Sequence, residues 1–63
     1  MSLGKAFRDI RGNRTLRDFA KLLDVSHAHL CNVENDKVDP SLALIYRCKM
    51  VTGVDPYLLA FAE

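Results

Sequence analysis

The sequence predicts an all-α fold of five short helices, and three observations support this prediction. Apolar residues recur at helical spacing along the 63-residue chain, and no segment alternates apolar and polar residues as a strand does. Ser, Thr or Asp precedes each apolar stripe, where a helix N-cap is expected. No linker, repeat or low-complexity tract interrupts the chain, so a single domain is expected over residues 1–63.

The first two helices follow from capping residues and apolar stripes near the N-terminus. Ser2 can cap the first helix, and Gly12 and Asn13 end it because both accept a positive φ. Its apolar stripe consists of Leu3, Phe7 and Ile10. Thr15 caps the second helix, and Asp18 follows three residues later in the manner of a capping box. The apolar face of this helix consists of Leu16, Phe19, Ala20 and Leu23.

The third helix follows the second after a very short turn. Asp24 and Val25 form the turn, and Ser26 caps a helix that runs to about Asn35. Its expected core residues are Leu30 and Val33. A connection of roughly three residues prevents the two helices from lying antiparallel, so they are expected to cross steeply as a helix-turn-helix.

A loop and two further helices complete the predicted fold. The loop ends at Pro40, which disfavours helical conformation in the residue before it. Ser41 caps the fourth helix and Gly53 closes it. Its expected inward stripe is Leu44, Ile45, Cys48 and Val51. Asp55 and Pro56 then form an N-cap followed by proline at the first position of the fifth helix, which carries Tyr57, Leu58, Leu59 and Phe61.

The net charge of +1 conceals an asymmetry along the chain. Residues 1–21 contain six basic and two acidic residues, for a net charge of +4, whereas the remainder contains three basic and six acidic residues, for −3. A basic face is typical of phosphate binding, and the alternative is an incidental solvated helix face. No apolar run approaches the about 20 residues that span a bilayer, and no signal-peptide pattern opens the chain. A cytoplasmic protein without membrane contact is therefore expected.

The sequence gives little support for catalysis, a cofactor or a metal. It has no paired-carboxylate site, glycine-rich phosphate loop or credible triad, so neither an enzyme nor a small-molecule substrate is expected. His27 and Cys31 have a spacing that suits two metal ligands, but no further ligand is placed to complete the site. A disulfide with Cys48 is not expected in a cytosolic chain. A redox-sensitive Cys31 stays open as an alternative.

The outward face of the third helix carries the candidate base-reading residues. The second helix of a helix-turn-helix can enter the major groove of DNA. Here its outward residues carry no acidic group; they are His27, Ala28, His29, Cys31 and Asn32. Asn32 can pair with adenine, His27 can donate to a guanine or a phosphate, and the Ala28 methyl suits a thymine methyl. The alternative for Asn32 is an ordinary solvated helix residue.

The order and spacing of these residues resemble the Cro/CI-type (XRE-like) helix-turn-helix domains of phage repressors and many bacterial regulators. The matching residues are Leu3-Gly4, Phe7, Ile10-Arg11, Thr15, Phe19-Ala20, Val25-Ser26, Leu30, Val33-Glu34-Asn35, Pro40-Ser41-Leu42, Leu44 and Gly53-Val54-Asp55. The resemblance covers nearly the whole chain. It implies a lambda-repressor-like fold that binds double-stranded DNA, usually as a homodimer on a two-fold symmetric operator.

The resemblance also implies roles for individual residues. Its base-reading positions fall on His27, Ala28 and Asn32, with His29 and Cys31 beside them. Its phosphate-contacting positions fall around Thr15, Arg17 and Lys37, to which we add the neighbouring Arg14. Glu34 is expected to form a structural ion pair with Arg11. The last helix has more apolar surface than one packed face needs, so a dimer seam is expected there, formed by Tyr57, Leu58, Leu59 and Phe61. The alternatives are simple core closure and docking onto a further C-terminal domain.

The chain departs from the family pattern at several positions. Many members have Gln at the position of Leu16, where it reaches the DNA, and Leu cannot make that contact. The usual glycines of the turn and of the following loop are Asp24 and Asp36 here, and Asp tolerates a positive φ better than most residues. Asp36 and Asp39 also place negative charge near the expected phosphate path, which is expected to weaken binding. The connection between the first two helices looks about two residues shorter than in the phage repressors.

The function expected from these features is sequence-specific DNA binding by a dimeric transcriptional repressor on a pseudo-palindromic operator. One alternative keeps the fold and makes it the DNA-binding part of an antitoxin or of a larger multidomain regulator. Another is a helical protein-interaction module that has lost DNA binding, which Leu16, Asp36 and Asp39 favour.

Overall fold

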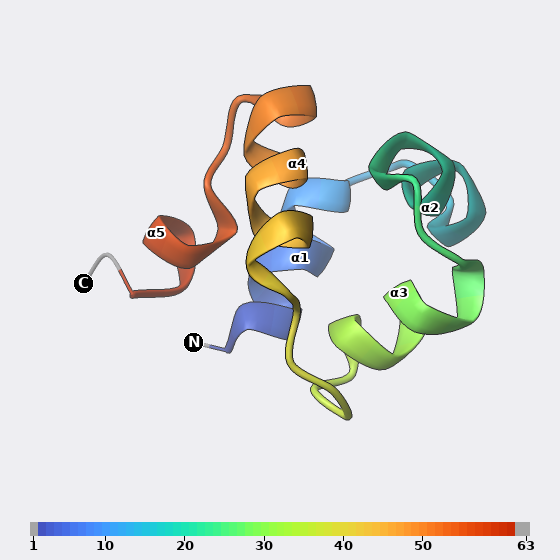
Figure 1. The fold of residues 1–63 in the computed structure, drawn as a ribbon, viewed down its shortest axis with the longest axis horizontal. Coiled ribbons are helices and arrows are strands. Elements are labelled where there is room, and N and C mark those ends of the chain that lie inside the picture. The colour runs from blue at the N-terminus through green and yellow to red at the C-terminus, as the bar shows by residue number, and fades with distance from the viewer. Residues whose placement is uncertain (1, 62–63) are drawn as a thin grey trace.

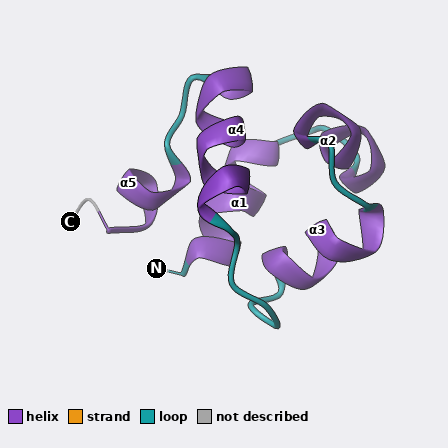
Figure 2. Ribbon diagram, viewed as in Figure 1, coloured by secondary structure: helices purple, strands orange, loops and turns teal. Residues whose placement is uncertain are grey.

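The computed structural model describes residues 2–61, and this part of the chain forms five helices (Figure 1). They are α1 (Leu3–Arg11), α2 (Leu16–Leu23), α3 (His27–Glu34), α4 (Leu42–Thr52) and α5 (Pro56–Phe61). The described residues include no strand, so the predicted all-α fold is confirmed (Figure 2). The two ends of the single domain expected over residues 1–63 lie outside the described residues.

A side-chain cap begins each of these helices at the predicted residue. In the first four helices a hydroxyl oxygen accepts the backbone N–H three residues later. The pairs are Ser2 with Lys5, Thr15 with Asp18, Ser26 with His29, and Ser41 with Leu44, at 3.0–3.1 Å. In α5 the Asp55 carboxylate accepts the Tyr57 N–H at 2.8 Å. Each bond satisfies an amide that the helix itself leaves without a partner.

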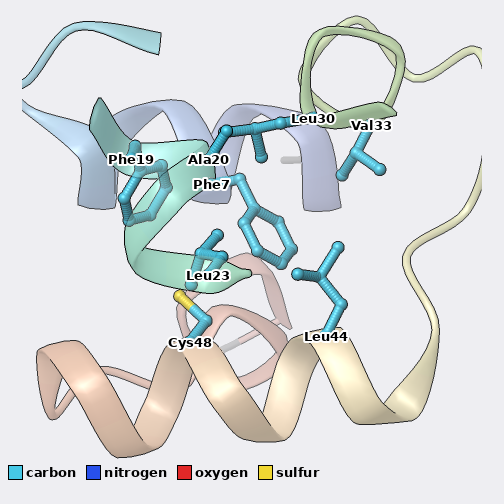
Figure 3. Close-up of a cluster of buried hydrophobic side chains, with 8 residues drawn as sticks. All are labelled: Phe7, Phe19, Ala20, Leu23, Leu30, Val33, Leu44 and Cys48. Carbon is cyan, nitrogen blue, oxygen red and sulfur yellow. The ribbon is translucent and has the colours of Figure 1, made fainter. Parts of the chain in front are cut away.

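The hydrophobic core draws its side chains from α1, α2, α3 and α4 (Figure 3). Its buried residues are Phe7, Phe19, Ala20, Leu23, Leu30, Val33, Leu44 and Cys48. Phe7 of α1 lies between side chains from the other three helices (Figure 3). Burying two phenylalanines and several aliphatic side chains supplies the main stabilising term of so small a domain.

One predicted core position in α4 is wrong. Val51 was expected on the inward stripe, but its side chain is 42% exposed. The inward line of α4 runs instead through Leu44, Cys48 and Thr52, which are spaced four residues apart. Thr52 is half-buried, and its hydroxyl donates to Cys48 O at 2.6 Å and accepts the Val54 N–H at 3.2 Å. A polar residue that satisfies the end of the helix therefore takes the place that the apolar pattern assigned to Val51.

The packing of the helices leaves α3 and α5 on different sides of α1. α1 packs against both α3 and α5, and α2 packs against α3 and α4 (Figure 1). In the helix-turn-helix pair, α3 thus packs against α1, and α2 packs against α4. In the described part of the chain, no helix has the length and apolar character needed to cross a membrane.

Candidate nucleic-acid interface

The turn between α2 and α3 is closed by backbone hydrogen bonds. Asp24 adopts the left-handed conformation, with φ of 58° and ψ of 43°. Its N–H donates to Lys21 O at 3.1 Å, and the Val25 N–H donates to Ala20 O at 3.0 Å. These bonds satisfy carbonyl groups at the end of α2 and allow α3 to begin after only three residues.

The face of α3 that points away from the core carries all the residues predicted to contact bases. His27, Ala28 and His29 are exposed, and Cys31 and Asn32 are half-buried. The opposite face is fixed in the interior by Leu30, Val33 and Glu34. Ala28 and Asn32 are four residues apart and so lie one above the other on the helix surface. The helix therefore places Ala28 and Asn32 at the centre of the outward side, with His27 and Cys31 on one flank and His29 on the other.

Two of the residues predicted to contact phosphate are exposed cations near the ends of the helix-turn-helix. Arg17 lies in the first turn of α2, and Lys37 lies in the loop after α3. The Lys37 N–H donates to Asn32 O at 2.9 Å, which fixes the start of that loop. The Thr15 hydroxyl is used as the cap of α2. Both cations can thus meet a backbone phosphate while the helix start adds its own positive dipole end.

Arg14 is also exposed, but its guanidinium contacts backbone carbonyls at the end of α1. Its Nη1 donates to Ile10 O at 3.2 Å and to Arg11 O at 3.5 Å. Its Cζ also lies 5.9 Å from the centre of the Phe19 ring, a cation–π distance. These contacts place the positive charge at the C-terminal end of α1, where the helix dipole favours it. The structure thus gives Arg14 an internal capping contact that the sequence did not indicate.

Glu34 joins α3 to α1 through a buried ion pair. Arg11 Nε lies 3.1 Å from Glu34 Oε2, and the Glu34 side chain is 4% exposed. The two atoms face one another as a close ion pair rather than as an aligned hydrogen bond. A buried carboxylate requires such a partner, because an unpaired buried charge is strongly destabilising. The pair expected between Arg11 and Glu34 is therefore present.

A second arginine of α1, which the sequence did not reveal, also holds the end of α3. Arg8 Nη2 donates to Glu34 O at 3.2 Å and to Asn35 Oδ1 at 3.0 Å. Its Nε lies 4.0 Å from Glu34 Oε1. Arg8 and Arg11 are three residues apart and so share one face of α1. That spacing was the available signal, but the acceptors lie 26 and 27 positions further along the chain.

The loop after α3 is tied to the beginning of α1. Asp36 has a φ of 60°, and its Oδ1 accepts the Gly4 N–H at 3.1 Å. A Cβ atom at Gly4 would lie 2.6 Å from Val33 O, so only glycine fits this approach of the two helices. The Asp36 carboxylate thus meets the positive end of the α1 dipole. Asp39 is exposed.

The turn between α2 and α3 is also held by a residue of α4. Arg47 Nη1 donates to Leu23 O at 3.2 Å and to Asp24 Oδ2 at 3.1 Å. No local sequence pattern indicates this contact, because the partners are 23 and 24 positions away.

The two cysteines occupy different environments and are both free. Cys31 is half-buried on α3, and its Sγ accepts the Asn35 Nδ2–H at 3.4 Å. Cys48 is buried in the core, and this burial raises the pKa of its thiol. Among residues 2–61, no three His, Cys, Asp or Glu side chains are grouped so as to hold a metal ion.

The last helix exposes most of its apolar side chains. The exposed fractions are 51% for Tyr57, 64% for Leu58, 37% for Leu59 and 58% for Phe61. The Tyr57 and Phe61 rings are in contact, with centroids 4.9 Å apart. The inward contacts of α5 are made by Pro56 and Ala60, which are buried. The helix therefore presents more apolar surface than its own packing uses.

A model of the HTH_3 helix-turn-helix family matches residues 5–59. The match begins within α1 and ends within α5, so it includes the whole of α2, the turn and α3. No curated protein and no solved structure gives a significant match to the chain.

Proposed function

The chain belongs to the HTH_3 helix-turn-helix family, which is of the Cro/CI type, and from this premise we propose that it represses transcription as a dimer on a pseudo-palindromic operator. The family consists of DNA-binding transcriptional regulators and is generally not enzymatic. One observation carries the proposal. The outward face of α3 exposes His27 and Ala28 beside the half-buried Asn32, while the inward face of the same helix is fixed in the core.

Direct contacts to bases are assigned to three residues of α3. The Asn32 carboxamide suits the N6 and N7 atoms of an adenine, with which it can form two hydrogen bonds. The Ala28 methyl suits the methyl group of a thymine, and His27 suits a guanine or a phosphate. His29 and Cys31 flank these positions, so they would limit which neighbouring base pairs fit.

Contacts to the DNA backbone are assigned to the start of α2 and to three exposed cations, Arg14, Arg17 and Lys37. The start of α2 at Thr15 supplies the positive end of a helix dipole. Arg17 and Lys37 supply full charges on either side of α3 in the sequence. Such contacts give affinity without sequence preference and fix how α3 sits in the groove.

A dimer follows from the weakness of a single half-site. One small module makes too few base contacts for selective binding, and a two-fold dimer doubles them on a symmetric operator. The exposed apolar residues of α5, Tyr57, Leu58, Leu59 and Phe61, form the proposed seam. Their exposure supports an intermolecular role over simple core closure.

The alternative of a protein-interaction module loses part of its support. It relied on Leu16, Asp36 and Asp39 as residues unfavourable for DNA binding. Leu16 packs against the hydrophobic core, and the Asp36 carboxylate accepts the Gly4 N–H. A structural contact therefore accounts for the presence of both residues. A DNA-binding part of an antitoxin or multidomain regulator would use the same α3 contacts as a free-standing repressor.

The experiment that tests the proposal is selection from a random duplex library at near-physiological salt. We expect enrichment of two inverted half-sites whose centres lie about one helical turn apart. Retention should fall steeply as salt rises, because phosphate contacts release counterions. Absence of enrichment together with absence of salt-dependent retention would contradict the repressor function and support the interaction module.

A further inference from the structure

The turn that precedes α3 contains an aspartate at a backbone position that glycine adopts more easily. Asp24 has a φ of 58°, in the left-handed region, where a Cβ atom is unfavourable. Glycine carries no such penalty, so the turn alone gives no reason for a carboxylate. The Asp24 side chain does have a partner, because its Oδ2 accepts a hydrogen bond from Arg47 Nη1 at 3.1 Å.

Arg47 links this turn to the rigid part of the core. The residue lies on α4, one position before the buried Cys48. The same Nη1 atom also donates to the carbonyl oxygen of Leu23, the last residue of α2. A single guanidinium nitrogen therefore contacts the end of α2 and the turn, two residues before the Ser26 cap of α3.

The opposite end of α3 is held independently from α1. There, Arg11 pairs with Glu34, and Arg8 donates to Glu34 O and to Asn35 Oδ1. The C-terminal end of α3 is thus fixed by two arginines, whereas the N-terminal end has Arg47 as its anchor to α4. The N-terminal end carries His27 and Ala28, which are proposed to contact bases.

We propose that Asp24 and Arg47 are positioning residues that set the orientation of α3 relative to α2 and α4, and thereby the sequence specificity of DNA binding. Neither residue needs to touch DNA. The inference rests on the proposed function, because specificity is its consequence. It also makes a statement about the free protein, namely that the contact between Asp24 and Arg47 fixes the orientation of α3.

The test compares Asp24→Gly and Arg47→Gln with a matched control, Lys49→Gln. Lys49 is an exposed residue of α4, and its replacement removes the same charge as Arg47→Gln. The quantity to measure is the ratio of affinity for the selected operator to affinity for a scrambled duplex. A change in net charge alters the affinity for both duplexes alike, so it cancels in this ratio. Loss of the negative charge in Asp24→Gly raises non-specific affinity, and loss of the positive charge in Arg47→Gln lowers it.

Both test variants are expected to lower the specificity ratio by roughly two- to fivefold, because the Asp24 side chain is 87% exposed and an exposed ion pair contributes only modestly. Lys49→Gln should leave the ratio at the wild-type value. The double variant should lower the ratio no further than Arg47→Gln alone, because that change already removes the contact with Asp24 together with the contact to Leu23 O. The urea midpoint of Asp24→Gly should be at or above that of the wild type, since glycine suits the turn. If Asp24 served only to stabilise the fold, the Asp24→Gly variant would keep the wild-type specificity ratio, because its stability is not reduced.

Unchanged ratios in both test variants, with a wild type that binds specifically, would overturn the inference. Fully additive losses in the double variant would also overturn it. If the wild type shows no specific binding, the proposed function fails, and the orientation of α3 is then measured without DNA. Residual dipolar couplings of α3 amides relative to those of α2 and α4 should differ between the wild type and Asp24→Gly. Identical couplings would refute the positioning role.

Discussion

Asn32 and Arg17 represent the two kinds of contact with a duplex that are proposed for this domain. Asn32 is half-buried on the outward face of α3, and Arg17 is exposed in the first turn of α2. A carboxamide can distinguish base pairs by the pattern of donors and acceptors in the groove. A guanidinium at the end of a flexible side chain meets the phosphate charge, which is the same for every sequence. Truncating the Asn32 side chain should therefore change sequence preference, whereas truncating the Arg17 side chain should change affinity for every duplex.

Replacing Asn32 by Ala is expected to weaken binding to the selected operator by about 1–3 kcal/mol and to relax the preference at one base pair. Arg17→Ala is expected to weaken binding to all duplexes alike and to reduce the slope of log K against log salt by about one. Fluorescence anisotropy on the operator, its single-base variants and a scrambled duplex at several salt concentrations measures both effects. If Asn32→Ala kept the full sequence preference, the base-reading face would lie elsewhere.

The two thiols should differ in reactivity because only one of them is accessible. The thiolate is the reactive form, and burial raises the pKa of the Cys48 thiol, so this residue should resist alkylation while the domain is folded. Cys31, which is half-buried, should react first. Mass spectrometry after brief treatment with a maleimide at pH 7.5, with and without urea, identifies the modified residue. Modification of Cys48 at the rate of Cys31 in the absence of urea would contradict its burial.

The raised pKa of Cys48 also fixes the sign of its effect on stability. The folded chain holds the thiol proton more tightly than the unfolded chain does. The stability that the protonated Cys48 thiol contributes is thus fully present below the ordinary thiol pKa of about 8.5. It is lost as the pH rises through the raised pKa of the folded state.

The contact between α1 and α3 tolerates few substitutions. α1 meets α3 at Gly4, whose position lies so close to the Val33 carbonyl that a Cβ atom would approach within 2.6 Å. The neighbouring Glu34 carbonyl would lie 2.7 Å away. These obstacles are backbone atoms, which cannot rotate aside as the end of a side chain can. The interface between α1 and α3 therefore depends on the absence of a side chain at one position.

Gly4→Ala is expected to destabilise the domain by about 1–3 kcal/mol, as overpacking does. Alanine favours the helical state by up to about 1 kcal/mol over glycine, and the close backbone contacts outweigh this gain. Lys5→Ala is the matched control, because this adjacent residue of α1 is exposed and its pair with Asp9 is worth little. Urea unfolding followed by circular dichroism measures both variants. Equal midpoints for the two would show that α1 can move away from α3 at no cost.

The sequence predicted the elements well because their signals are local. A cap such as Ser26 contacts an amide three residues away, so its consequence is visible in a short segment. The contacts of Arg47 and Arg8 depend on the tertiary fold, and no local pattern specifies them. Val51 was misplaced because apolar spacing does not reveal that Thr52 closes the end of α4 with its hydroxyl. The exposure of the outward side of α3 could be predicted from local spacing, whereas the contacts of Arg8 and Arg47 could not.

The two surfaces proposed to be functional lie on different helices. The proposed DNA contacts lie on α2, α3 and the following loop, and the proposed seam lies on α5. α1 separates them, since it packs against both α3 and α5 (Figure 1). Two copies could thus associate through α5 while each keeps its α3 available to a half-site.

Leu58→Asp is expected to abolish dimer formation and to reduce affinity for the full operator toward that of a single half-site. A charge placed in an apolar seam typically costs about 2 kcal/mol or more at a central position. Leu42→Asp is the control, because Leu42 is 82% exposed on α4 and lies outside the seam. Sedimentation equilibrium of each variant, with binding to duplexes carrying one or two half-sites, gives the result. A dimer that survives Leu58→Asp and is lost in Leu42→Asp would move the seam to α4.

The exposure of His27, Ala28 and His29 has an evolutionary consequence. These side chains face solvent, so exchanging them removes nothing from the hydrophobic core. The residues that hold α3 in place, by contrast, are engaged in the interior or in contacts between helices. Mutational drift can therefore alter the preferred operator in single steps while the scaffold persists unchanged. Paralogues that share this framework and differ at these three positions would inherit one architecture and diverge in their target genes.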